Sequence, residues 1–297
     1  MQAVVTYGDE KANRRKIIIR LSIVYSLLVL FGLFIVVPFY WMILTSFKTE
    51  AQVFTAPPIL WVNPFEWQFT NFALALERAP FARFMANTVL VSLISTVGTV
   101  VTTIFAAFAF ARLNFVGREL LFLMLVATMM IPGEMFVITN FLTVVQLGWI
   151  QNQTFTDAVL AMTLPFMTSI FYIFFLRQTF KQIPNELYYA AKVDGTKDFQ
   201  YLWKVMVPIA MPTLITITIL NAMGTWNAYI WPRLVTQRES YRLVSNGLRD
   251  AFTDTLGVIQ YNEQMAAALL VTMPLLIVFL LLKKYIIRGV SRSGIKG

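Results

Sequence analysis

A few long stretches without any charged side chain divide this chain, and they limit what it can fold into. They cover residues 21–47, 84–111, 120–133, 135–156, 158–176, 205–232 and 264–282. A helix needs about 20 mainly apolar residues to cross roughly 30 Å of hydrocarbon, and most of these stretches reach or approach that length. Only 13% of the residues are charged. Because a typical soluble domain carries about 25%, a water-soluble globule is excluded.

Six membrane-spanning helices account for these stretches. The two stretches on either side of Glu134 form one span, near residues 120–141, followed by an uncharged loop. Backbone groups that face lipid must pair within their own segment, and the sequence lacks the short alternating segments of a membrane barrel. We therefore predict an all-α, polytopic membrane protein with six transmembrane helices. Residues 1–16 form an N-terminal segment, residues 17–288 a single transmembrane domain, and residues 289–297 a tail.

The distribution of Lys and Arg predicts the side of the membrane on which each loop lies. On the side of the N-terminus there are 17 of these residues, and on the other side there are 7. By the positive-inside rule, both termini are predicted to be cytoplasmic. The net charge of +9 therefore reflects orientation rather than nucleic-acid binding. Because the first span is longer than the 7–15 apolar residues of a signal peptide, we expect it to remain as an anchor.

The absence of Cys and His restricts the chemistry of the chain. It removes thiol nucleophiles, imidazole bases and the usual zinc ligands. The remaining carboxylate, Lys, Ser, Thr and Tyr residues form no convincing catalytic set, so we predict a transport subunit with no catalytic and no metal-binding residues. The alternative is a stand-alone secondary transporter or channel for a small polar solute. Proton or sodium coupling, however, usually leaves several ionisable residues within the membrane, and here only Glu134 is present.

The predicted cytoplasmic connection at residues 181–204 contains a short helix. Asn185 is a favourable N-cap, Glu186 suits the first turn, and Gly195 suits the left-handed residue that ends a helix. A helix of about two to three turns is not stable alone, so it must lie against another surface. An ordinary helical turn in a cytoplasmic loop is the other interpretation.

The side chains of this short helix offer a contact surface. Leu187, Tyr188 and Tyr189 supply apolar area, and Ala190 and Ala191 leave a shallow place for a neighbouring surface. These features favour docking of a partner against the helix.

The same connection resembles a known sequence motif. It follows the pattern Pro184-x-Glu186-Leu187-x-x-Ala190-Ala191-x-x-Asp194-Gly195, with Pro208 and Pro212 further on. This pattern is similar to the "EAA" loop of the inner-membrane permeases of ABC importers, and it lies between the fourth and fifth of six predicted spans. Other stretches resemble the carbohydrate-type branch, that of the shorter permease of maltose-type importers. They are residues 106–112, 131–133, 226–227 and 289–297, together with Pro232.

This resemblance implies a type I ABC importer permease and a set of partners. Such permeases dock the EAA-type helix into a cleft on a cytoplasmic ATPase, and closure of two ATPase subunits swings the spans between inward-facing and outward-facing states. A second related permease and an extracytoplasmic solute-binding protein complete the assembly. The implied location is the cytoplasmic (inner) membrane of a bacterium or archaeon, in contact with lipid and not with nucleic acid.

The resemblance also implies where ATP binds. This chain has no G-x-x-x-x-G-K-[ST] phosphate loop, so ATP and magnesium belong to the partner ATPase, and no cofactor is expected on this chain. The implied ATPase contact consists of Glu186, Leu187, Tyr189, Ala190, Ala191, Asp194 and Gly195. Tyr189 stands where the family usually has a glutamate, so a tyrosine hydrogen bond or stacking contact replaces the expected ion pair. In the tail, Arg292 and Lys296 are expected to reach toward the ATPase pair.

Four residues are candidates for the substrate path, namely Glu134, Asn221, Trp226 and Asn227. Glu134 is the one acid within a predicted span, and it also follows a Pro-Gly pair where it would complete hydrogen bonds at a kink or pair with the neighbouring permease. Asn and Trp suit a sugar, although anchoring at the membrane interface is the other interpretation for Trp226 and Asn227. We predict import of a mono- or oligosaccharide, with a polyol or glycerol phosphate as the less favoured substrate.

Overall fold

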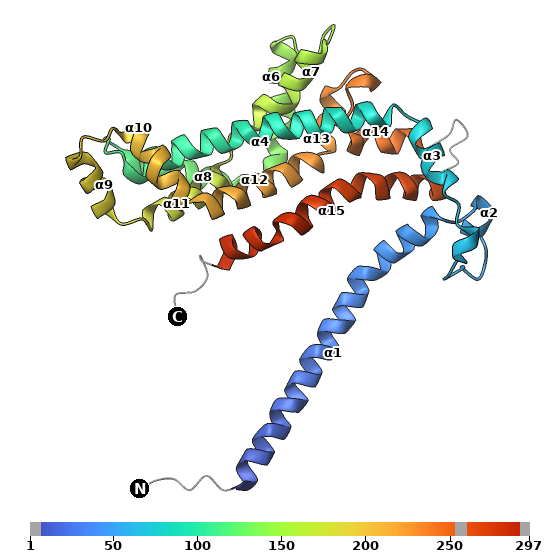
Figure 1. Cartoon of the computed structure of the whole chain (residues 1–297). Helices are drawn as coiled ribbons and strands as arrows, with labels where there is room; N and C mark the ends of the chain where they lie inside the picture. The colour runs from blue at the N-terminus through green and yellow to red at the C-terminus, as the bar shows by residue number, and fades with distance from the viewer. Residues whose placement is uncertain (1–6, 253–259, 292–297) are drawn as a thin grey trace. The chain divides into compact units, whose positions relative to one another are not determined.

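The computed structural model describes residues 7–252 and 260–291 (Figure 1). Within these ranges the chain is helical and contains no β-strand, as predicted. It forms two compact units. The first unit consists of residues 1–75 and 259–269, and the second consists of residues 76–258 and 270–297.

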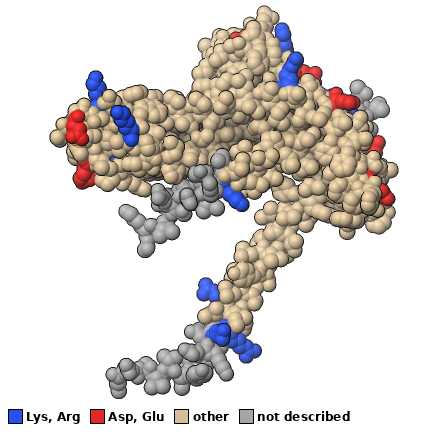
Figure 2. Space-filling model, in the orientation of Figure 1, with Lys and Arg blue, Asp and Glu red and all other residues tan. Residues whose placement is uncertain are grey.

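Three helices are long and apolar enough to cross a membrane without interruption. These segments are Arg14–Ser46 of α1 (Tyr7–Ser46), Phe81–Arg112, which is α4, and Tyr261–Leu281 of α15 (Tyr261–Ser291). Basic side chains gather at the N-terminal end of α1, and the rest of that helix is uncharged over a long distance (Figure 2). These helices match three of the uncharged stretches of the sequence.

Three further apolar segments are pairs of helices that are each bent at a short break. Arg118–Met130 and Gly133–Gln146 meet at 85°, Phe155–Phe166 and Ile170–Lys181 at 52°, and Asp198–Ile209 and Met211–Trp226 at 79°. The described part of the chain thus holds three spanning helices, or up to six if each bent pair is one span. The predicted number of six is the upper limit of this range, and the cytoplasmic position of the termini stays a prediction.

In the first unit, a short irregular segment follows α1. It contains α2 (Glu50–Val53), a 3₁₀ turn at Pro64–Glu66 and the beginning of α3 (Thr70–Glu77). Lys48 is buried here, donating from Nζ to the carbonyl oxygen of Ile59 at 2.7 Å and lying 4.3 Å from the centre of the Trp41 ring. Asn71 donates to the carbonyl oxygens of Ser46 and Lys48. These bonds fix the chain where it leaves α1.

The second unit is built around α4. Its other helices are α5 (Arg118–Ala127), α6 (Phe136–Gln146), α7 (Phe155–Thr163), α8 (Ile170–Lys181), α9 (Asn185–Val193), α10 (Asp198–Tyr201), α11 (Val207–Ile209), α12 (Met211–Trp226), α13 (Ile230–Val235), α14 (Val244–Ala251) and the rest of α15. One apolar cluster includes Phe108 of α4, Leu176 of α8 and Ile217 of α12. A second includes Val91 of α4 and Trp231 of α13. Because α4 contributes to both clusters, it forms the axis of the unit.

Hydroxyl groups of α4 satisfy carbonyl groups at one of the helix breaks. Between α7 and α8, the hydroxyl of Thr99 donates to the carbonyl oxygen of Phe166 at 3.3 Å, and that of Thr102 donates to Met167 at 2.6 Å. A broken helix is tolerated within a membrane when a neighbouring helix pairs the backbone groups that the break releases. The break is therefore part of the packing of α8 against α4.

Candidate functional site

The short helix predicted in the cytoplasmic connection is α9, and both of its ends are defined. Gly195 has φ +73°, the left-handed conformation predicted for it. Its N–H donates to the carbonyl oxygen of Lys192 at 3.0 Å, and the N–H of Thr196 donates to that of Ala191 at 2.8 Å. This pair of bonds is the Schellman arrangement, which satisfies the last carbonyl groups of a helix.

The beginning of α9 differs from the prediction. Asn185 was expected to cap the helix, but Pro184 occupies the N-cap position and no side chain caps it. Proline before a helix has a fixed φ that directs the chain into the first turn. Asn185 is instead the first helical residue, and its side-chain oxygen accepts a hydrogen bond from Arg112. The N-cap prediction for Asn185 is therefore wrong.

The inner face of α9 packs on the segment that follows it. The ring of Tyr188 lies 5.1 Å from that of Tyr201, and its hydroxyl donates to Asp198 at 2.7 Å. Lys192 forms an ion pair of 2.7 Å with the same carboxylate. Burial and the Asp198 carboxylate raise the pKa of Tyr188, and the hydrogen bond to Asp198 raises the pKa of Lys192. The second half of α9 is thereby tied to α10.

The outer face of α9 remains open. Leu187, Tyr189 and Val193 are 45%, 63% and 88% exposed. The remaining predicted contact residues divide between the two faces. Glu186, Ala190, Asp194 and Gly195 are exposed, whereas Ala191 is half-buried against the apolar cluster of α4, α8 and α12. Tyr188, which the sequence grouped with the apolar contact area, faces inward.

A buried arginine holds the corner between α8 and α9. Arg112 is the last residue of α4 and is only 7% exposed. Its guanidinium donates to the carbonyl oxygen of Phe180 at 2.8 Å, to the carbonyl oxygen of Ile183 and to the side chain of Asn185. One side chain thus joins α4, the end of α8 and the start of α9.

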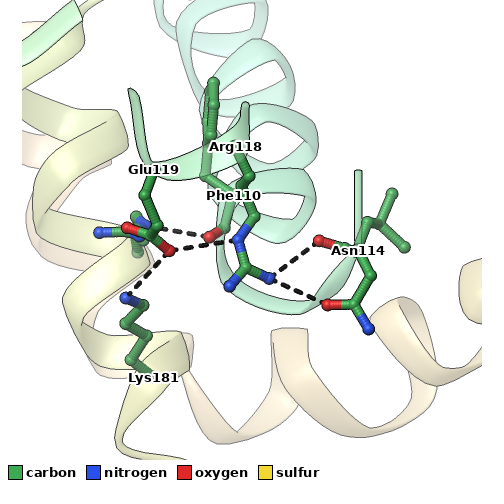
Figure 3. A network of polar contacts seen from close by, with 7 residues as sticks. Phe110, Asn114, Arg118, Glu119 and Lys181 are labelled. Atoms are coloured by element: carbon green, nitrogen blue, oxygen red, sulfur yellow. Dashed lines mark hydrogen bonds and ion pairs between the residues drawn. The ribbon is translucent and has the colours of Figure 1, made fainter. Parts of the chain in front are cut away.

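A second polar cluster, which includes Phe110, Glu119 and Lys181, also holds the C-terminal end of α8 (Figure 3). Arg177 of α8 donates to the carbonyl oxygen of Phe110 at 3.0 Å and to Glu119 at 2.6 Å, and its guanidinium lies 3.7 Å from the centre of the Phe122 ring. Lys181 lies 3.7 Å from the same carboxylate. The ends of α4, α5 and α8 therefore form one cross-linked corner.

Three of the four candidates for the substrate path lie on α12 or at its C-cap, whereas Glu134 lies between α5 and α6. Glu134 lies exposed in the turn Gly133–Met135 between α5 and α6, where the helix pair is bent by 85°. Asn221 donates to the hydroxyl of Thr96 at 3.2 Å. Asn227 donates to the carbonyl oxygen of Met223 in its own helix at 2.9 Å.

Two cavities open beside α12. Asn221 lines one of about 200 Å³, together with polar and aromatic groups that include Ser95, Tyr172, Thr225 and Trp231. Trp226 lines another of about 480 Å³, whose walls are almost entirely apolar. The two candidates of α12 therefore face different surroundings.

A comparison with protein families identifies the chain. Residues 98–292 match the model of the family described as "Binding-protein-dependent transport system inner membrane component". The chain belongs to this family. It is therefore an inner-membrane permease component of a transport system, and the predicted location is confirmed. The matched residues include α9, Arg177 with its partners, and residues 98–112 of α4.

Permeases of this family from several bacteria are similar to the chain over most of its length. The sn-glycerol-3-phosphate transport system permease protein UgpE of Yersinia pestis bv. Antiqua (strain Antiqua) is 28% identical, covering 91% of this chain and 95% of that protein. The diacetylchitobiose uptake system permease protein NgcG of Streptomyces coelicolor is 26% identical, covering 92% and 88%.

A solved structure shares the fold of this permease. It is that of a bacterial ABC transporter involved in the import of the acidic polysaccharide alginate, and the likeness covers 96% of this chain and 99% of that chain with a TM-score of 0.77 and 24% identity. This likeness supports the type I permease architecture predicted from the sequence.

Sequence reasoning missed the groups that hold α9 in this permease. Arg112 was placed among the cytoplasmic positive charges and in the stretch 106–112 that resembles the carbohydrate-type branch, but no contact was predicted for it or for Asp198. The one available signal was the position of Arg112 at the end of an uncharged stretch, directly before the chain turns. The predicted tail residues Arg292 and Lys296 lie outside the described residues.

Proposed function

We propose that this permease is a subunit of an ATP-driven importer that moves a sugar or oligosaccharide across the cytoplasmic membrane by alternating access. In this proposal α9 is the coupling helix through which a partner ATPase moves the spans. Hydrolysis takes place on that partner, which binds ATP and magnesium. The role of this chain is to convert the movement of α9 into a rearrangement of α4, α8 and α12.

The arrangement of α9 carries this proposal. A helix of nine residues is too short to be stable alone, yet here it is fixed along its inner face and at both ends. Its outer face presents Leu187, Tyr189 and Val193, which are large apolar side chains at an exposed position. A helix that is held firmly and leaves apolar groups uncovered is suited to docking into a groove of another protein. Glu186, Ala190, Asp194 and Gly195 belong to the same contact surface.

Tyr189 is the central residue of this proposed contact. Its ring is 63% exposed, and among the described residues its hydroxyl has no hydrogen-bond partner. A tyrosine offers both an apolar ring and a hydrogen-bond donor, so one side chain serves as anchor and as polar contact. In the proposed complex Tyr189 takes the place of the glutamate usual in the EAA motif.

A carbohydrate is the proposed substrate. The Streptomyces relative is named for uptake of diacetylchitobiose, and the Yersinia relative for glycerol 3-phosphate, so the family branch handles polyhydroxylated solutes. Asn221 is the best placed of the proposed path residues, because it lines a cavity that also contains hydroxyl and aromatic groups. Glu134, Trp226 and Asn227 are proposed as further path residues with less support from their surroundings.

The proposed assembly contains two ATPase subunits, a second related permease and an extracytoplasmic solute-binding protein. The family description supports dependence on a binding protein, and the proposed tail contacts of Arg292 and Lys296 would add to the ATPase interface. A tagged copy of this chain, expressed in its own host and purified in mild detergent, tests the assembly. We expect an ATPase and a second permease to co-purify with it, and a Tyr189→Ala variant to recover less ATPase while keeping the second permease.

A transport measurement completes the test. Membranes that contain the assembled complex are expected to take up radiolabelled substrate only when ATP is supplied on the cytoplasmic side. If the purified chain instead transports a solute without partners and without ATP, the proposal is overturned in favour of a secondary transporter or channel.

A further inference from the structure

Arg112 has contacts that its role as a cytoplasmic positive charge does not explain. The positive-inside rule requires only that a basic residue lies on the cytoplasmic side, where exposed side chains serve equally well. Arg112 is instead only 7% exposed and directs three hydrogen bonds to the corner between α8 and α9. Such burial of a guanidinium is unfavourable unless good partners compensate for the lost water.

The partners of Arg112 are neutral oxygens rather than carboxylates. In residues 7–252 and 260–291, no Asp or Glu forms an ion pair with it. Its compensation comes from the carbonyl oxygens of Phe180 and Ile183, at and beyond the C-terminus of α8, where the helix dipole places partial negative charge. The favourable surroundings of Arg112 therefore exist only while the α8–α9 corner stays against the end of α4.

The third partner of Arg112 belongs to α9 itself. Asn185 stands at a helix start, where asparagine usually caps its own helix, but α9 has no side-chain cap and the Asn185 oxygen accepts from Arg112 instead. The side chain thus joins the first turn of α9 to a different helix. A local capping interaction has been replaced by a long-range one.

α4 connects the α8–α9 corner directly to the region beside α12. It runs without a proline from Arg112 back to Phe81, and Thr96 lies 16 residues before Arg112. At a rise of 1.5 Å per residue this is a distance of about 24 Å. There Thr96 accepts a hydrogen bond from Asn221, a residue that lines the cavity beside α12.

We propose that Arg112 is the positioning residue that couples the start of α9 to α4, so that displacement of α9 is passed to the part of α4 beside the cavity. This inference rests on the proposed function, in which an ATPase displaces α9. It assigns the first step of transmission to one side chain. Removal of Arg112 should uncouple α9 from α4 and leave the docking face of α9 intact.

The chain offers a matched control in Arg118. This arginine also lies at the cytoplasmic end of α4 and α5, and it donates to the carbonyl oxygen of Leu113 at 3.0 Å and to the side chain of Asn114 at 3.3 Å (Figure 3). Arg118 also forms an ion pair of 3.2 Å with Glu119, its neighbour in α5, and none of these contacts reaches α9. Arg118→Gln therefore removes the same charge from the same side of the membrane without touching α9.

Hydrogen–deuterium exchange of the intact complex tests the inference without knowledge of the substrate. The complex is purified with its ATPase and compared with and without ATP, Mg²⁺ and orthovanadate. In the unmodified complex we expect the nucleotide to change deuterium uptake in two places, at α9 and in residues 81–99 of α4. In Arg112→Gln the change at α9 should persist and the change in residues 81–99 should be lost. Arg118→Gln should show both changes.

This readout separates positioning from a merely structural role. Loss of stability alone would raise deuterium uptake in both nucleotide states, whereas loss of coupling removes the difference between them. Arg112→Lys is expected to restore only part of the difference, because an ammonium group cannot bridge the three acceptors as the planar guanidinium does. If Arg112→Gln does not assemble, Asn185→Ala decides the matter, because it removes one acceptor and leaves the buried bonds of Arg112 to α8.

The outcomes distinguish this inference from the proposed function. If the unmodified chain binds no ATPase, the proposed function fails. If the unmodified complex responds at α9 but not in residues 81–99, or if Arg112→Gln and Asn185→Ala both keep the full response of α4, the positioning role of Arg112 is overturned and the proposed function stands.

Discussion

Replacement of Gly195 by alanine should loosen the end of α9 without creating a steric clash. Gly195 has φ +73°, and a Cβ atom placed on it would meet no atom within 4 Å. The space around the residue is open, so any effect of a side chain must come from the backbone conformation. This isolates one physical cause, which is the strain of a non-glycine residue in the left-handed region.

The size of the effect follows from that strain. A left-handed conformation costs an L-residue other than glycine roughly 1–2 kcal/mol, and asparagine adopts it more readily than alanine does. Since 1–2 kcal/mol corresponds to a factor of about 5–30 in an equilibrium, local opening of the Schellman turn should become more frequent by that factor in Gly195→Ala. Gly195→Asn should show a smaller increase, and the β-branched Gly195→Val a larger one.

Amide exchange measures this opening directly. The N–H groups of Gly195 and Thr196 donate to the carbonyl oxygens of Lys192 and Ala191, so their exchange reports on the turn. Gly148 is the matched control, because it has φ +77° and equally open surroundings but lies far along the sequence from α9. Gly148→Ala should leave the exchange of α9 unchanged.

Two results would refute this reasoning. Equal exchange in Gly195→Ala and the unmodified chain would show that the left-handed turn does not limit the opening of α9. For the proposed lever, Gly195→Val should abolish uptake while the isolated ATPase stays active, and normal uptake by this variant would contradict the model.

Two further predictions concern the packing of the second unit. In Gly247→Ala the new Cβ would lie 2.3 Å from a ring carbon of Phe84, a residue only 1% exposed, so we expect a loss of about 1–3 kcal/mol, measured as a lower unfolding temperature in detergent. Tyr188→Phe removes the hydrogen bond to Asp198 and should cost about 1 kcal/mol, seen as faster amide exchange in the second half of α9. The neighbouring Tyr189→Phe, whose hydroxyl is exposed, should leave that exchange unchanged.

The uncharged stretches predicted where the apolar helices lie, with six spans as the upper limit of the three to six in the described residues. The Pro132-Gly133 pair predicted the kink near Glu134, but the breaks between α7 and α8 and between α11 and α12 were not predicted. Charge-free stretches show which residues can lie in lipid. Because proline is uncharged, such a stretch can contain a helix break that the pattern of charges does not show. Proline alone also does not decide where a helix breaks, since α1 contains Pro38 and α15 contains Pro274 within continuous helices. The break between α7 and α8 is stabilised by Thr99 and Thr102 of α4, which are distant in sequence. Such a break depends on a neighbour that no local pattern reveals.

In the candidate site, too, features that depend on neighbouring residues were predicted, and contacts between distant residues were not. The end of α9 was predicted from Gly195 because a left-handed cap is a local feature of the backbone. The start of α9 was predicted wrongly, because Asn185 bonds to Arg112, a residue 73 positions earlier in the chain. Tyr188 was placed on the open surface, but its hydroxyl is bound by Asp198 in the next helix. The predicted role of a side chain was wrong where its hydrogen-bond partner lies on another helix.

The two attachments of α9 lead back to the same place in the protein. At its start, Arg112 connects it to α4, and in its second half, Tyr188 connects it through Asp198 to the chain that continues into α12. α4 and α12 then meet again at the hydrogen bond between Thr96 and Asn221. In the proposed function this closed path means that a push on α9 reaches α4 and α12 together. If α4 and α12 move by different amounts, the hydrogen bond between Thr96 and Asn221 must therefore lengthen or break. This bond lies directly beside the cavity that Asn221 lines.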